Sequence, residues 1–145
     1  MTRASSIRTA TAADLPAALE LLRDAALPVA DLCAERLALV AYQEQEIRGV
    51  IGLESFENLG LLRSLVVSRE TRGNRLGAAL VSALEAMCRQ RGVQGLWLLT
   101  IDADAFFEKL GYVVRSREAA PDAIRGTEEF SVLCPGDAVL MSKEL

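Results

Sequence analysis

The clearest hydrophobic pattern in the chain lies between residues 75 and 91. Its apolar side chains recur at intervals of three and four positions: Leu76, Ala79, Leu80, Ala83, Leu84 and Met87. This spacing places them on one face of an α-helix, with polar residues on the opposite face. Gly92 is a typical residue for a helix end. The pattern therefore predicts an amphipathic helix over residues 75–91.

Short apolar runs on both sides of this helix predict strands. Residues 37–42, 47–56 and 61–67 are linked by turn-forming residues, so they predict an antiparallel meander. Residues 95–100 are apolar without alternation, which is typical of a buried parallel strand. Strand 61–67, helix 75–91 and strand 95–100 then form a right-handed βαβ unit.

The remaining segments predict shorter elements. These are a strand at Ser6–Ala10, a helix capped by Asp14 and running to about Ala26, a short helix at residues 29–35, a helix over residues 102–111 capped by Asp102 and ended by Gly111, and closing strands at residues 112–118 and 138–145. An irregular or helical segment separates the two closing strands. The elements together predict a single-domain α/β fold over residues 1–145. Its sheet is expected to be twisted, mixed and mostly antiparallel, with about seven strands and flanking helices.

The charge balance and hydropathy narrow the classes of partner. The 145 residues carry a net charge of −4, which disfavours nucleic-acid and anionic-membrane partners. No apolar run reaches the roughly 18 residues that a membrane span needs. The first residues also lack the apolar segment of a secretory signal. We therefore expect a cytoplasmic protein, and the edge strands of its sheet leave a homodimer open.

The content of histidine and cysteine excludes several chemistries. The chain has no histidine, so histidine acid–base catalysis, Ser-His-Asp triads and histidine metal ligands are excluded. The three cysteines, Cys33, Cys88 and Cys134, form no Cys-x-x-Cys pair. We expect them to be reduced and packed as small apolar groups, and we expect no metal. A soft-metal or arsenical site built from all three is an alternative that their spacing does not support.

The loop before helix 75–91 is rich in glycine and arginine. It reads Arg72-Gly73-Asn74-Arg75-Leu76-Gly77, and a helix N-terminus that follows such a loop attracts phosphate. The loop lacks Gly-Lys-Ser/Thr and Gly-x-Gly, so it is neither a Walker loop nor a Rossmann fingerprint. From the loop alone, a tight turn in which Gly77 lets the helix pack on the sheet is an equally good interpretation.

Two linked motifs resemble those of the GNAT N-acetyltransferase superfamily. Arg72…Arg75-Leu76-Gly77 is similar to the Arg/Gln-x-x-Gly-x-Gly/Ala motif that follows the fourth strand in that family. The segment Phe106-Phe107-Glu108-Lys109-Leu110-Gly111-Tyr112 is similar to the aromatic-Tyr-x-Lys-x-Gly-Phe segment that follows the fifth. The order of the expected elements also matches. A narrower likeness, carried by Cys134-Pro135 and by an Ala-Pro…Ile-Arg-x-Thr-x-Glu-Phe segment, is to small N-acetyltransferases of arsenic-resistance gene sets.

The resemblance implies acetyl-CoA as the co-substrate and a small-molecule amine as the acceptor. Arg72 would open the pyrophosphate loop, whose backbone N–H groups belong to Gly73, Asn74, Arg75, Leu76, Gly77 and Ala78. The pantetheine arm would pair with the strand at Leu65 and Val67. The thioester would lie where strands 61–67 and 95–100 diverge. A backbone N–H at Val66 or Val67 would hold the developing oxyanion during direct attack by the amine.

Two positions depart from the family pattern. Arg75 replaces a glycine. We expect negative φ there, because a residue entering a helix usually has it, and we expect the guanidinium to reach a CoA phosphate. The alternative is a solvated arginine without a ligand role. Phe107 stands where many relatives carry a tyrosine that protonates the leaving thiolate. A phenyl ring cannot donate a proton, so we expect Phe107 to pack beside the pantetheine, with Tyr112 as a candidate replacement acid.

The general base is not evident, because strand 61–67 contains no carboxylate. Glu54 and Glu57 on the preceding strand are candidate bases, with a solvated strand edge as the alternative for both. Ser64 and Thr100 are candidates for ordering a water molecule.

Two arginines are candidate clamps for an acceptor carboxylate, with an ordinary surface arginine as the alternative for each. Arg63 is expected to share a strand face with Leu65 and Val67, and Arg125 precedes the last strand. A guanidinium binds a carboxylate bidentately and would lower the pKa of the neighbouring amine. The sequence therefore predicts acetyl transfer to the primary amine of an amino-acid-like substrate. An acyl-CoA-binding module with little turnover is the alternative.

Overall fold

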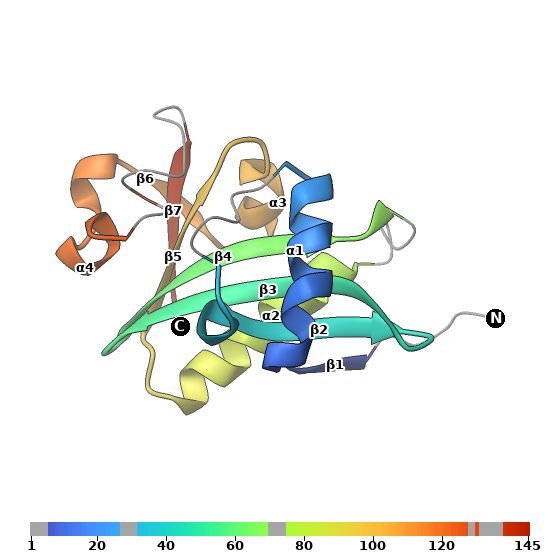
Figure 1. Cartoon of the computed structure of the whole chain (residues 1–145). Coiled ribbons are helices and arrows are strands. Elements are labelled where there is room, and N and C mark those ends of the chain that lie inside the picture. The colour runs from blue at the N-terminus through green and yellow to red at the C-terminus, as the bar shows by residue number, and fades with distance from the viewer. Residues whose placement is uncertain (1–5, 27–31, 70–74, 128–129, 131–137) are drawn as a thin grey trace. The chain divides into compact units, whose positions relative to one another are not determined.

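The structure, a computed structural model, describes residues 6–26, 32–69, 75–127, 130 and 138–145. The strands are β1 (Ser6–Thr9), β2 (Leu37–Gln43), β3 (Glu46–Phe56), β4 (Leu59–Val67), β5 (Gly95–Thr100), β6 (Val113–Arg115) and β7 (Val139–Glu144). The helices are α1 (Leu15–Asp24), α2 (Leu76–Gln90), α3 (Asp104–Lys109) and α4 (Asp122–Arg125). The seven strands form one sheet in the order β1-β2-β3-β4-β5-β7-β6 (Figure 1).

Contacts within the chain group it into two compact units. The first comprises Met1–Leu53 and Ser64–Met87, and the second comprises Glu54–Arg63 and Cys88–Leu145. The division passes through β3 and β4, so each unit contains one part of both strands. The candidate cofactor-binding residues at Leu65–Val67 and Arg75–Ala78 therefore belong to the first unit. Glu54, Arg63, Thr100, Phe107 and Arg125 belong to the second.

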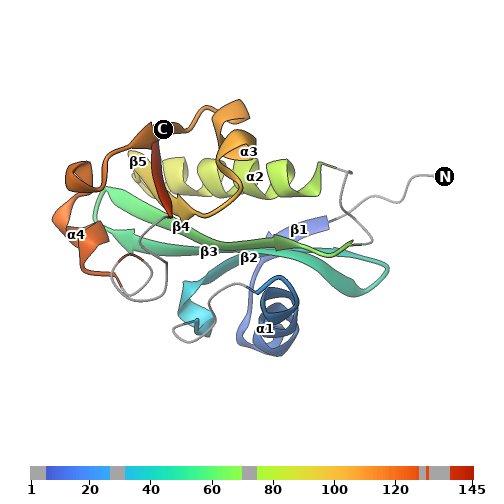
Figure 2. The ribbon, with the colours of Figure 1, turned by 90° about the horizontal axis from the view of Figure 1, so that it is seen from above.

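In the first unit, strands are covered by helices on both faces. β2 pairs antiparallel with β1 and with β3, and the pairing with β3 is the one that the sequence predicted. α1 and α2 lie on opposite faces of these strands (Figure 2). One buried cluster joins α1 to the strands: Ala18, Leu22, Leu32, Leu37, Val40, Val50 and Val66. On the other face, a Cβ atom added at Gly49 would lie only 3.0 Å from Leu80 Cδ1, so glycine lets α2 approach β3 closely.

In the second unit, β4 and β5 run parallel, and their pairing extends from Leu59↔Gly95 to Leu61↔Trp97. β7 lies antiparallel between β5 and β6. A second buried cluster comprises Leu61, Trp97, Ala120, Ile124 and Leu140. The parallel pairing of β4 and β5, with α2 between them in the chain, confirms the predicted βαβ connection.

The sequence located the strands to within a few residues, but one of the two predicted helix caps is wrong. Asp14 is the N-cap residue of α1, as predicted, although its side chain makes no cap hydrogen bond to that helix. Thr11 is the N-cap of a 3-10 turn that precedes α1. α3 begins at Asp104, not after Asp102, and its N-cap is Ala103. Thr100 Oγ1 accepts a hydrogen bond from the backbone N–H of Ala103 at 3.0 Å, so the strand end provides the hydrogen-bond acceptor at this turn.

The predicted short helix at residues 29–35 lies partly outside the described residues. The part that the structure describes contains only a 3-10 turn at Ala34–Arg36. The segment between the closing strands contains a 3-10 turn at Arg117–Ala119 and the short helix α4. Both agree with the irregular or helical conformation expected there.

The Asp14 carboxylate forms an ion pair with Arg8 and makes no cap hydrogen bond to α1. It accepts hydrogen bonds from Arg8 Nη1 at 2.8 Å and Arg8 Nη2 at 2.9 Å, and from the Thr11 N–H at 2.8 Å. The Arg8 guanidinium also lies 4.9 Å from the centre of the Tyr42 ring. The hydrogen bond with Arg8 lowers the pKa of Asp14 from its ordinary 3.8 to about 2.

We expect Asp14→Asn to lower Tm by a few degrees at neutral pH, because the variant loses this bidentate pair. The pKa of the folded state lies below the ordinary value, so the stabilisation is complete above pH 3.8 and is lost as the pH falls through about 2. Thermal melts of the wild type and the variant, recorded from about pH 2 to pH 7, measure how the difference in Tm changes with pH. Arg8→Met should give the same pattern. A Tm difference that stays constant down to pH 2 would contradict it.

Candidate functional site

The last residues of β4 leave the regular strand conformation at Ser64. This residue has a φ of 57°, in the left-handed region. Beyond it, Val66 is buried in the α1 cluster, and Leu65 and Val67 are half-buried. The alternation of side chains along a strand does not continue through such a residue. The expectation that Arg63 shares a face with Leu65 and Val67 therefore loses its basis.

The N-terminus of α2 lies in the same unit as this end of β4. The N–H of Ala79 donates to the carbonyl of Arg75 at 3.0 Å. The N–H groups of Leu76, Gly77 and Ala78 precede this bond and lie in the first turn of the helix, where N–H groups have no carbonyl partner within the helix. They are the kind of donors that bind phosphate. The predicted loop residues Arg72, Gly73 and Asn74 lie outside the described residues.

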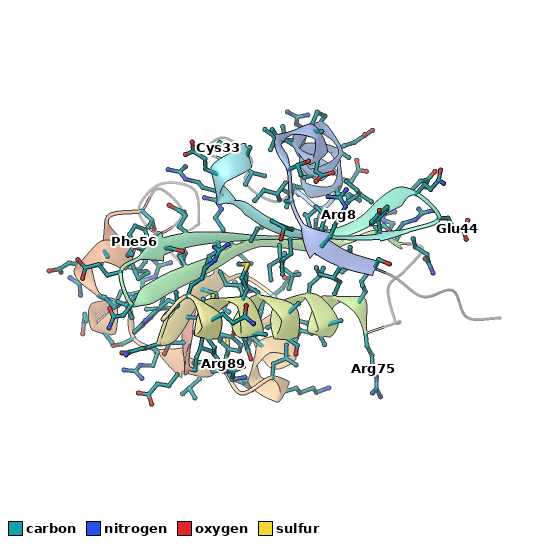
Figure 3. The ribbon with its side chains drawn as sticks, turned by 90° about the horizontal axis from the view of Figure 1, so that it is seen from below. Arg8, Cys33, Glu44, Phe56, Arg75 and Arg89 are labelled. Atoms are coloured by element: carbon teal, nitrogen blue, oxygen red, sulfur yellow. The ribbon has the colours of Figure 1, made fainter. Side chains whose placement is uncertain are left out.

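Arg75 does not have the negative φ expected of it. Its φ is 60°, a left-handed conformation that costs most residues about 1–2 kcal/mol relative to glycine. The glycine of the family motif would therefore serve the backbone torsion as well as close approach. The side chain of Arg75 is exposed and points away from the sheet at the start of α2 (Figure 3).

Gly49 on β3 brings the two parts of this candidate site together. A Cβ atom added there would lie 3.3 Å from the carbonyl oxygen of Val66 and 3.5 Å from Leu76 Cδ2. The backbone near the end of β4 and the first residue of α2 thus approach the same point of β3. Sequence analysis did not single out Gly49, because a glycine within a strand has several explanations.

In the second unit, Glu54 and Arg63 form a buried ion pair between β3 and β4. Arg63 Nη1 lies 3.0 Å from Glu54 Oε2. The Arg63 side chain is 0% exposed and that of Glu54 is 11% exposed. Arg63 is therefore not a surface arginine. Glu57, the other candidate base, is exposed and has a φ of 55° just after β3.

Phe107 is buried on α3 between two other aromatic rings. Its ring contacts Phe106 with centroids 5.0 Å apart and Tyr112 with centroids 5.5 Å apart, both edge to face. Tyr112 is itself 2% exposed, as expected for the position it occupies. Lys143 Nζ donates to the carbonyl of Leu110 at 2.8 Å and lies 5.6 Å from the Tyr112 ring centre. No sequence pattern links Lys143 to this helix, because 33 residues separate it from Leu110.

The remaining candidates also have local partners. Thr100 ends β5 and its hydroxyl accepts the hydrogen bond from Ala103 described above. Arg125 is exposed on α4, and its Nη2 donates to the backbone carbonyl of Glu118. A guanidinium carries five N–H donors, so this single bond does not exhaust its capacity.

Among the residues that the structure describes, no group of three or more histidine, cysteine or acidic side chains could hold a metal ion. Cys33 is half-buried and Cys88 is buried, and neither forms a disulfide. Cys134 lies outside the described residues. No helix in the described part of the chain is long and apolar enough to cross a membrane.

The arrangement of these elements agrees with a comparison of the sequence with known families. The sequence model of the Acetyltransferase (GNAT) family matches residues 6–112. The chain belongs to the GNAT acetyltransferase family. The match includes β4, α2 and α3, which carry both of the motifs singled out in the sequence of this GNAT chain.

The relatives of this GNAT chain differ in how much of their own length the match with this chain covers. An uncharacterized N-acetyltransferase of Chlorobaculum tepidum is 35% identical over 66 residues, which are 46% of this chain and 42% of that protein. N-acetylglutamate synthase from Neisseria gonorrhoeae, solved with coenzyme A and L-arginine, has a TM-score of 0.83 at 18% identity and covers 99% of this chain. This chain covers only 34% of the synthase.

A Mycobacterium tuberculosis protein solved in complex with CoA has a TM-score of 0.80 at 20% identity. The match covers 97% of this GNAT chain and 99% of that protein. At these identities the two solved structures establish the shared fold.

We expect Arg75→Gly to raise the free energy of unfolding by about 1 kcal/mol, because glycine adopts the left-handed conformation without a Cβ clash. Ala79→Gly is the matched control, since it places the same residue at an exposed position within α2 and should lower that free energy by about 1 kcal/mol. Urea denaturation measures both. Destabilisation of equal size by the two substitutions would show that the conformation of Arg75 is not strained.

Proposed function

We propose that this GNAT chain transfers an acetyl group from acetyl-CoA to the primary amine of a small molecule. The observation that carries the proposal is the set of N–H groups in the first turn of α2. They belong to Leu76, Gly77 and Ala78, the residues just before Ala79, whose N–H donates to the carbonyl of Arg75. Family membership, and the neighbours solved with coenzyme A, support the choice of ligand. Gly77 has no side chain to obstruct a phosphate, and Arg75 can supply a guanidinium beside it.

The residues of β4 fit the other end of the cofactor. Leu65 and Val67 are half-buried strand residues of the kind that pair with an extended ligand chain, and Val66 anchors this segment in the core. We assign the oxyanion-binding N–H to Val66 or Val67 and a supporting role to Ser64. When bound, acetyl-CoA supplies the activated acetyl group, and the residues of the chain bind it and exclude water.

Phe107 sets a limit on the chemistry of the leaving group. It is 5% exposed and has no proton to donate. A thiol with a pKa near 8.5 can leave as thiolate and take its proton from water, so turnover does not require an acid at this position. A phenyl ring packed against the pantetheine would still exclude solvent.

The acceptor is proposed to be an amino-acid-like amine with a carboxylate or a similar oxyanion. Exposed Arg125 is the candidate clamp, with Thr100 as a further polar group of the acceptor site. The likeness to arsenic-resistance acetyltransferases adds oxyanion analogues of acidic amino acids to the candidates. Arg63 was the second candidate clamp, and its completely buried side chain is paired with Glu54.

An acyl-CoA-binding module with little turnover is the second candidate function. Phe107 is the observation that favours it, because the usual proton donor is missing. Release of free CoA thiol, measured against a panel of amines, separates the two functions. Binding of CoA without thiol release for any amine would favour the binding module.

We expect Gly77→Asp to abolish acetyl-CoA binding in a protein that stays folded. The new carboxylate would face the negative phosphates and obstruct their approach to the N–H groups. Calorimetric titration measures the loss, and circular dichroism checks the fold. Gly77→Ala is the matched control, because it tests the added Cβ atom without a charge. Unchanged affinity in a folded Gly77→Asp protein would rule out this position for the cofactor.

We expect Arg125→Ala to raise KM for glutamate-like acceptors by about tenfold or more, since a charge-assisted hydrogen bond is lost. KM for acetyl-CoA should stay unchanged. Arg89→Ala, an exposed arginine substitution on α2, is the control. If polyamines are the best acceptors and Arg125→Ala acetylates all amines normally, the proposed acceptor class is wrong.

A further inference from the structure

Gly49 occupies a buried position on β3 where a side chain would not fit. A Cβ atom added there would lie 3.0 Å from Leu80 Cδ1, 3.3 Å from the carbonyl oxygen of Val66 and 3.5 Å from Leu76 Cδ2. The first two distances are shorter than an ordinary van der Waals contact, which begins near 3.4 Å. The φ of Gly49 is not positive, so space, and not backbone torsion, requires glycine here.

These contacts come from the two parts of the proposed cofactor site. The carbonyl of Val66 belongs to the peptide that joins Val66 to Val67, and this peptide also carries the N–H of Val67, one of the two candidate oxyanion donors. Leu76 is the first residue of α2, and Leu80 lies one turn later on the same helix face. Gly49 thus lies between the backbone proposed to hold the thioester and the helix turn proposed to hold the pyrophosphate.

Backbone pairing on both sides restrains β3 at this point. The N–H of Ser68, just beyond the end of β4, donates to the carbonyl of Arg48 at 2.7 Å. On the other side, Gly49 pairs with Ala41 of β2. A Cβ atom on Gly49 would therefore displace its neighbours, which are the Val66 peptide and α2. A displacement of a few tenths of an ångström would relieve the contact.

We infer that Gly49 is a positioning residue that sets the distance between the end of β4 and the start of α2, so that both ends of acetyl-CoA bind at once. The inference rests on the proposed function. The pantetheine arm links the thioester to the pyrophosphate. Binding of one end therefore brings the other to a high effective concentration only if the spacing of the two protein sites matches the arm. A change in this spacing weakens the coupling without removing either site.

The test compares the complete cofactor with a fragment that reaches only one of the two sites. The nucleotide part of CoA, phosphoadenosine diphosphate, carries the pyrophosphate and lacks the pantetheine arm. We expect Gly49→Ala to raise the Kd of acetyl-CoA by about tenfold, because a misplacement of about 1 Å can cost about 100-fold and this displacement is smaller. The Kd of the nucleotide should change by less than about twofold. Calorimetric titration measures both, and circular dichroism checks the fold.

Gly95→Ala is the matched control. Gly95 is also a buried glycine in a strand, but a Cβ atom added there would make only ordinary contacts, the nearest at 3.5 Å to Leu59 Cδ2. Both affinities should stay unchanged in this variant. If Gly49→Ala does not fold, Gly49→Ala/Leu80→Val removes the Leu80 Cδ1 atom and keeps the close contact with the Val66 carbonyl. The double variant should show the same selective loss, and Leu80→Val alone should not.

The outcomes distinguish this inference from the function on which it rests. Losses of equal size for acetyl-CoA and for the nucleotide would assign Gly49 a general packing role and overturn the inference. Unchanged affinity for acetyl-CoA in a folded Gly49→Ala protein would also overturn it. Failure of the transferase function has a different signature, which is binding of acetyl-CoA without thiol release for any amine, and the two affinities then still decide the inference. A wild-type chain that binds neither ligand would overturn both.

Discussion

The conformation of β4 at Ser64 is the constraint on which the candidate site depends. Up to Leu61 the strand pairs in parallel with β5, and three residues later its backbone enters the left-handed region. A strand that continued its regular pleat would pair along its length and present alternate side chains to the two faces. The change at Ser64 ends that regularity and gives Leu65, Val66 and Val67 a backbone arrangement of their own. Val66 then fixes this segment by burial in the α1 cluster.

Charged side chains complete this framework in places where the sequence pattern would predict apolar or solvated residues. Arg63 and Glu54 join β3 and β4 within an apolar environment. Arg8 and Asp14 join β1 to the turn before α1. Lys143 reaches from β7 to the last turn of α3, beside Gly111, and contacts Tyr112, which packs on Phe107. Each interaction connects two different elements, so each restrains how one element can move against the other.

Arg75 illustrates a conflict between local stability and the proposed function. Its left-handed conformation would suit glycine, and an arginine there lowers stability. Strained residues persist where the surrounding structure imposes them, and they occur often at ligand-binding positions. The side chain is exposed at the start of α2, where a guanidinium can meet a phosphate held by the helix N–H groups. The proposed binding of CoA gives the strained arginine a function that a glycine could not perform.

The two motifs that identified the family could be recognised in the sequence because each is a short continuous segment. Arg72 to Gly77 and Phe106 to Tyr112 each combine a turn signal with the adjoining helix. The positions of strands and helices could also be predicted, since hydrophobic periodicity reflects which face of each element is buried. The same pattern predicted the antiparallel meander and the parallel pairing of β4 with β5.

Features that depend on contacts distant in sequence were decided only by the tertiary structure. The sequence of residues 61–67 contains no sign that Ser64 is left-handed, so strand geometry placed Arg63 on the face of Leu65 and Val67. The ion pair of Arg63 with Glu54 and the contact of Lys143 with Leu110 depend on which strands and helices lie side by side. Asp14 has the residue type of a helix cap, yet Arg8 from a neighbouring strand binds its carboxylate. The sequence by itself determined the elements and the family, because these follow from local periodicity and local motifs. The tertiary structure decided the partners of the charged residues, because a charge is neutralised by whichever opposite charge the fold brings within reach.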